Sequence, residues 1–208
     1  MNDKPIFYDT DCLSSFLGVN KINILEKLYS QIIISTTVKE EFFNQSTPNP
    51  IKERLQNCIN KNYVQIKDLE LDSKEFNTYY ELYTSLEGEN DGKGELTTIA
   101  LAKTYNGIIA SNNLKDICKY IKKFNLKHIT TSVILQTSYK KGHITLNEAC
   151  ETWNKMINNG IKLIHAFRHA YDFTWNKMIN NGIKLPEKSF KDYISKKDHL
   201  CYQKGVLS

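Results

Sequence analysis

The sequence lacks the features of a membrane protein and those of a secreted, disulfide-stabilised one. No apolar run approaches the ~18 residues that a membrane-spanning helix needs. The first residues, MNDKPIFYD, include an acid and no apolar core, so we expect no signal peptide. The five cysteines are widely separated and form no CxxC pair, which favours reduced thiols in a cytoplasm over a disulfide or zinc framework.

The charge of the chain is modest overall but unevenly distributed. The net charge is +5 over 208 residues, yet the stretch 68–95 carries nine acids against two lysines, and 115–141 carries seven lysines against one acid. A basic surface beside an acidic pocket would suit a polyanion whose phosphates approach a metal, and the equally weighted alternative is two solvated helix faces. The candidate RNA-binding residues are Lys115, Lys119, Lys122, Lys123 and Lys127.

Short apolar segments alternate with helical patterns along the first two thirds of the chain. Continuous apolar runs at 5–8, 31–35, 107–110 and 127–130 are typical of parallel strands buried on both faces. The pattern therefore predicts an α/β fold, a three-layer α/β/α arrangement with a mostly parallel central sheet. Two details of the helices are also predicted: Asn20 caps the helix that follows it, and the aromatic stripe of Phe76, Tyr79, Tyr80 and Tyr83 lies in the core.

The chain after about residue 144 has a helical pattern without strands. We therefore predict an α/β domain at 1–143 and a helical C-terminal appendage at 144–208. The appendage contains one internal repeat, because TWNKMINNGIKL occurs at 152–163 and again, letter for letter, at 174–185. Solenoid repeats diverge and need about three copies to be stable, so two identical copies indicate a recent duplication.

Four acids from distant parts of the chain are predicted to meet at one edge of the sheet. Residues just past the ends of parallel strands gather along one edge, where α/β proteins bind their ligands. Individually, Asp9 could cap a helix, Glu41 could be surface charge and Glu95 could favour a helix N-terminus. Together they form a cluster that needs a compensating cation, and oxygen-only ligands suit Mg²⁺ or Mn²⁺ better than zinc. The candidate catalytic and metal-binding acids are Asp9, Glu41, Glu95 and Asp116.

At these positions the sequence resembles the PIN-domain family of nucleases over about residues 4–141. The segments that carry the resemblance are FYDTDCL, TTVKEEF, GKGELTTIALA and GIIASNNLKDI. The second segment assigns the acid of the family's helix to Glu41 and not to Glu40. The resemblance implies a Mg²⁺- or Mn²⁺-dependent ribonuclease that acts on RNA, as in many toxins of toxin–antitoxin pairs. It also implies an antitoxin protein or a second copy of the chain as candidate partners.

The segment ASNNLKD departs from the family's acidic turn. Asn113 stands where the family often has its fourth acid, and Asp116 falls where some members carry a further one. An asparagine offers a carbonyl ligand without charge, so Asn113 is expected to bind the metal and to leave the site weakened but not dead. Asp11 and Asn112 are expected to bind the metal or position a water. The alternative to an endoribonuclease is a catalytically weak or inactive module that binds RNA or a protein.

Overall fold

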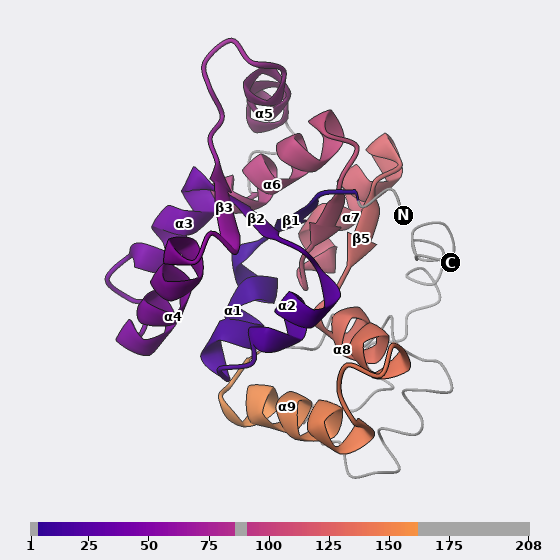
Figure 1. Ribbon diagram of the computed structural model, residues 1–208. Helices are drawn as coiled ribbons and strands as arrows, with labels where there is room; N and C mark the ends of the chain where they lie inside the picture. The colour runs from indigo at the N-terminus through magenta and orange to yellow at the C-terminus, as the bar shows by residue number, and fades with distance from the viewer. Residues whose placement is uncertain (1–3, 86–90, 162–208) are drawn as a thin grey trace.

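A single parallel sheet forms the middle layer of the protein (Figure 1). The computed structural model describes residues 4–85 and 91–161. The sheet has five strands in the order β3-β2-β1-β4-β5, and every neighbouring pair is parallel. The strands are β1 Ile6–Tyr8, β2 Ile32–Ser35, β3 Val64–Lys67, β4 Ile108–Ala110 and β5 Lys127–Ile129. The predicted mostly parallel α/β fold is confirmed.

Helices cover both faces of this sheet, because neighbouring residues of a strand point to opposite faces. In β1, Ile6 and Tyr8 lie in one apolar cluster and Phe7 lies in the other. The first cluster contains residues of α1, α2, α3, α4, α8 and α9, and the second contains residues of α5, α6 and α7. The described helices are α1 Thr10–Gly18, α2 Asn23–Leu28, α3 Thr36–Phe43, α4 Asn49–Asn60, α5 Lys74–Thr84, α6 Lys93–Thr104, α7 Leu114–Phe124, α8 Thr131–Lys140 and α9 Leu146–Asn158. The result is the three-layer arrangement predicted from the sequence.

The strand β3 was not predicted, for a reason visible in its burial. It pairs only with β2 and lies at the edge of the sheet. Val64 is its one buried residue, whereas Gln65 is exposed and Ile66 and Lys67 are partly buried. An edge strand with so little apolar sequence does not give the continuous run that marks the central strands.

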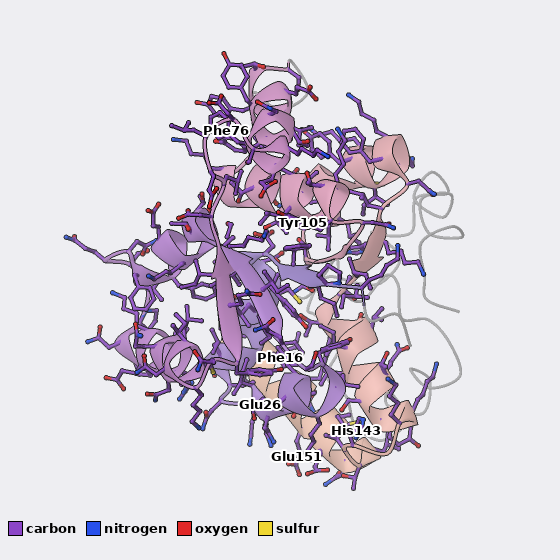
Figure 2. The ribbon with its side chains drawn as sticks, turned by 45° about the horizontal axis from the view of Figure 1, so that its top comes forward. Phe16, Glu26, Phe76, Tyr105, His143 and Glu151 are labelled. Carbon is purple, nitrogen blue, oxygen red and sulfur yellow. The ribbon has the colours of Figure 1, made fainter. Side chains whose placement is uncertain are left out.

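Two predictions about the helices are wrong. Asn20 is not an N-cap: it has a positive φ of 56° in the turn after α1, and α2 begins at Asn23 with Ile22 as its N-cap. The aromatic stripe of α5 is only partly core, because Tyr80 and Tyr83 are 58% and 48% exposed. Leu82 is the buried residue of α5, and it belongs to the apolar cluster that α5, α6 and α7 form with one face of the sheet. The spacing of these residues places them on one face of α5, the helix on which Figure 2 labels Phe76, but the fold leaves much of that face in solvent.

The helix α9 is packed into the main apolar cluster. Its residues Ala149, Cys150, Trp153 and Met156 are buried in that cluster, and the helix contacts α1 and α8. The first copy of the repeat begins in this helix, whereas the second copy at 174–185 lies outside the described residues. The division of the chain near residue 143 stays a prediction. No helix within the described ranges is long and apolar enough to cross a membrane.

We predict that α9 is essential for cooperative folding. Trp153 is fully buried, so Trp153→Ala should remove its contacts, leave a cavity and lower the free energy of unfolding by about 3–5 kcal/mol. Lys155→Ala is the matched control, because Lys155 is exposed on the same helix. Denaturant unfolding followed by circular dichroism measures both. Equal, small losses in the two variants would show that α9 does not support the core.

Candidate active site

Acidic side chains from four helices lie at the edge where the strands end. Asp9 directly follows β1 and is the N-cap of α1. Glu41 lies in α3, which leaves β2, and Asp116 lies in the first turn of α7, which leaves β4. Glu95 lies in the first turn of α6, whose chain direction is opposite to that of the strands, so its N-terminus returns to the same edge. The topology therefore places all four predicted acids at one edge of the sheet.

Asp9 is the most buried of these acids, with 5% of its surface exposed. Its Oδ1 accepts a hydrogen bond from the backbone N of Thr10 at 2.8 Å, which caps α1. Its Oδ2 accepts from Ser111 Oγ at 3.2 Å. Asp9 therefore has the capping role that its sequence position allowed and also faces the end of β4.

Glu41 is held against α6 by a close approach of the two helices. Thr10 Oγ1 donates a hydrogen bond to Glu41 Oε2. A Cβ added at Gly94 would lie 2.9 Å from that same Oε2, so any larger residue there would push the Glu41 carboxylate out of its present position. Glu40, the neighbouring candidate, is exposed. The geometry therefore agrees with Glu41 as the residue that faces the other acids.

Asn113 links the remaining two acids. Its Nδ2 donates to Glu95 Oε1 at 2.5 Å and to Asp116 Oδ2 at 2.8 Å. The expected role of Asn113 was that of a carbonyl ligand, whereas here its amide nitrogen, a donor, faces the carboxylates. Asn113 thus belongs to the cluster, and its amide would have to rotate before its oxygen could bind a cation.

Asp11 and Asn112 are hydrogen-bonded to each other, and Asn112 is also hydrogen-bonded to Thr131. Both carboxylate oxygens of Asp11 accept from the backbone N of Asn112, at 3.1 and 3.0 Å. The side chain of Asn112 is 4% exposed, accepts from the backbone N of Thr131 and donates to Thr131 Oγ1. Since protein atoms hold both ends of this amide, Asn112 joins the end of β4 to the start of α8.

Burial and mutual repulsion raise the pKa of several acids in the cluster. For Asp9, burial is the main cause of a pKa well above its ordinary value, and the negative charges of Asp11, Glu95 and Glu41 add to it. Burial and the charge of Asp116 raise the pKa of Glu95 to about 7, against the opposing hydrogen bond from Asn113. Burial raises the pKa of Asp11 to about 6. These carboxylates would gain free energy from a nearby cation.

The predicted RNA-binding lysines are divided between the two ends of α7. Lys115 and Lys119 belong to the first half of α7, whereas Lys122 and Lys123 belong to its last turn. Because α7 runs back across the sheet before β5, Lys122, Lys123 and the first residue of β5, Lys127, lie toward the opposite edge. Lys119 Nζ makes an ion pair with Asp91 Oδ2 at 2.8 Å. Three of the five lysines therefore lie away from the acidic edge, whereas Lys115 and Lys119 lie on the half of α7 that begins at it.

Three polar residues of this edge were missed in the sequence. Ser111 Oγ holds Asp9 and accepts from the backbone N of Asn113 at 3.1 Å. Thr10 holds Glu41, and Asp91 lies beside α7. The available signal was position alone, since Thr10 and Ser111 each come within two residues of a strand end. Small hydroxyl residues are so common there that their types single out no site.

The chemistry of the donors fits a hard divalent cation, although their arrangement is closed by hydrogen bonds. Across residues 4–85 and 91–161, no group of three or more His, Cys, Asp or Glu side chains is placed so that it could hold a metal ion. The cluster nevertheless offers carboxylate oxygens, the ligands of Mg²⁺ and Mn²⁺, and their raised pKa values favour a positive partner. Binding would require Asn113 and Thr10 to release the oxygens that they now contact.

Comparison with known proteins gives one family. A family model described as a PIN domain matches residues 5–170, which include the whole sheet and all the described helices. No curated protein matches the sequence at a significant level.

We predict that the cluster lowers stability as it ionises. An acid whose pKa is higher in the folded protein makes the folded state bind more protons, so its contribution is favourable below the unfolded pKa and is lost as pH rises through the folded pKa. For Glu95 this window runs from 4.5 to about 7. Glu95→Gln should therefore reduce the decline in unfolding free energy between pH 4.5 and 8, on the order of 1 kcal/mol after solvent screening.

Denaturant titrations of both proteins at several pH values, without divalent metal, measure this difference. Glu40→Gln is the control, because Glu40 is an exposed acid near the same edge. Parallel pH profiles for wild type and Glu95→Gln would contradict the predicted electrostatic cost.

Proposed function

The chain belongs to the PIN-domain family, and from that premise we propose that it is a divalent-metal-dependent endoribonuclease. The fold is of the nuclease type, and PIN domains generally depend on divalent metals and act on RNA. The observation that carries the proposal is the meeting of Asp9, Glu41, Glu95 and Asp116 at one edge of the sheet, where burial and neighbouring charges raise the pKa of Asp9 and of Glu95.

In this proposal the four acids hold Mg²⁺ or Mn²⁺, and the phosphodiester lies against that edge. The chemistry that such a cation supplies is activation of a water and neutralisation of phosphate charge. The protein's part is to keep the acids close. Thr10 and Gly94 fix the position of Glu41, Ser111 fixes Asp9, and Asn113 lies between Glu95 and Asp116. No histidine or serine nucleophile is required.

We predict that cleavage of single-stranded RNA requires Glu41. Glu41→Gln should reduce the cleavage rate by at least about 100-fold, because it removes one of the charges that would hold the cation. The adjacent Glu40→Gln should retain wild-type activity, since Glu40 is exposed away from Thr10 and Gly94. Gel assays with Mn²⁺, Mg²⁺ or EDTA measure the rates. Equal activity of the two variants would reject the proposed site.

Growth arrest gives a cellular test of the toxin hypothesis. If the protein acts as a cytoplasmic toxin, expression of the wild type should arrest growth and Glu41→Gln should not. An antitoxin would be a protein that relieves this arrest when expressed with it. If cells that express the wild type grow normally although the purified protein cleaves RNA, the toxin hypothesis is wrong and the ribonuclease proposal still holds.

The position of Asn113 supports a second candidate, a PIN-like module with little or no catalytic activity that binds RNA or a protein. Asn113 supplies no charge, and its amide nitrogen donates hydrogen bonds to oxygens of Glu95 and Asp116 that a cation would need. A site closed in this way would bind metal more weakly than one with a carboxylate at position 113 as well.

We predict that Asn113→Asp separates the two candidates. The substitution replaces two hydrogen bonds by like-charge repulsion, so the melting temperature without metal should fall by several degrees. Added Mn²⁺ should then raise the melting temperature more than in wild type, because ligand binding stabilises the folded state. Differential scanning calorimetry measures both shifts. A metal-induced rise in Asn113→Asp but none in wild type would favour the inactive module.

The lysines at the end of α7 and the start of β5 are proposed to contact the RNA backbone away from the cleavage point. Changing Lys122, Lys123 and Lys127 together to Gln should weaken binding of a long single strand and reduce the slope of log affinity against log salt by ~2. Cleavage of a dinucleotide should be unchanged, because it is too short to reach from the acids to these lysines. An unchanged salt slope would assign the lysines to solvated surface.

A further inference from the structure

An ion pair between the buried Asp91 and the more exposed Lys119 lies beside the acidic cluster and joins the start of α6 to the middle of α7. Asp91 directly precedes Gly92, the N-cap of α6, and its side chain is 7% exposed. Asp91 Oδ2 accepts from Lys119 Nζ at 2.8 Å and from Tyr120 Oη at 2.6 Å. Tyr120 is fully buried. We name the contact of these three residues, Asp91, Lys119 and Tyr120, the α6–α7 clasp.

The clasp connects the two turns that carry Glu95 and Asp116. On one side, the N–H of Gly92, next to Asp91, donates to Glu95 Oε2 at 3.4 Å. On the other side, Lys119 and Tyr120 follow Asp116 by three and four residues, which is one turn of α7. A change at Asp91 would therefore alter the separation of the two acids without touching either of them.

A second link between the same two turns would have to break when a cation binds. That link is Asn113, whose amide uses oxygens of Glu95 and Asp116. A cation shared by the two carboxylates needs those oxygens, so this amide must move. The clasp uses none of them, because its acceptor is Asp91. It can therefore stay in place while the acids exchange a hydrogen-bond donor for a metal.

We infer that Asp91 is a positioning residue, which acts with Lys119 and Tyr120 to hold Glu95 and Asp116 at a separation that lets them share one divalent cation. This inference rests on the proposed function, since it names what sets the geometry of the proposed metal site. It also assigns Lys119 to the support of that site, and not to the phosphates of RNA.

The test compares two chemically matched hydroxyl deletions in the full-length protein. Tyr120→Phe removes the donor to Asp91 and keeps the ring. Tyr105→Phe removes the same kind of bond at the other end of α6, where Tyr105 Oη donates to Glu75 Oε1 at 2.7 Å (Figure 2 labels Tyr105). Calorimetric titration with Mn²⁺ should show about tenfold weaker binding for Tyr120→Phe, a typical cost of losing a residue that orients a ligand, and wild-type binding for Tyr105→Phe. Equal affinities in the two variants would overturn the inference.

A double-mutant cycle separates positioning from general loss of structure. Asp91→Ala should weaken Mn²⁺ binding about tenfold in the wild type but hardly at all in an Asp116→Asn background, because its effect passes through Asp116. A full tenfold loss in both backgrounds would show that Asp91 acts in some other way and would overturn the inference.

Wild-type protein that takes up no Mn²⁺ would instead overturn the proposed function. In that case, amide hydrogen exchange tests separately whether the clasp connects the first turns of α6 and α7. Tyr120→Phe should speed exchange several-fold in both first turns, at residues 93–96 and 114–117, and leave the end of α6 unchanged. Faster exchange in only one of the two turns, or in neither, would show that the clasp does not connect them.

Discussion

Repulsion between carboxylates confined to one edge of the sheet is the interaction on which the rest of the site depends. Burial and neighbouring negative charges raise the pKa of Asp9 and Glu95, so ionising these acids costs free energy of folding. The protein holds all four acids with three neutral donors, the side chains of Thr10, Ser111 and Asn113. Neutral donors orient a carboxylate without cancelling its charge. These hydrogen bonds therefore stabilise the cluster in the folded protein and leave its negative charge available to a cation.

The ion pair beside the cluster shows how the fold separates support from chemistry. Lys119 neutralises Asp91, an acid that lies next to the site but faces α7. Had the same ammonium group paired with Glu95 or Asp116, it would have competed with a metal for the carboxylate. The direction of α7 matters in the same way, because it carries Asp116 at the acidic edge and Lys122 and Lys123 toward the opposite one. An RNA strand would have to extend along the protein to contact both.

The family match agrees with the architecture and gives the cluster its most direct interpretation. The departure at position 113 has a physical meaning in this setting. A carboxylate there would add a further negative charge beside Glu95 and Asp116, whereas the amide of Asn113 donates to both. In the proposed metal site, an amide in place of an acid would lower the affinity for the cation and would make the folded protein more stable without metal.

The sequence by itself determined the parallel sheet, its central strands and the convergence of the four acids. Continuous apolar runs are required by strands buried on both faces, and parallel strands must end at one edge, so Asp9 and Asp116 could be placed from order alone. The sequence did not reveal the edge strand β3, the exposure of Tyr80 and Tyr83, or the turn formed by Asn20. Only the tertiary structure decided that the amide nitrogen of Asn113 faces the acids and that Lys119 pairs with Asp91. Side-chain partners between residues far apart depend on how helices pack, and a pattern of residue types along one chain does not contain that information.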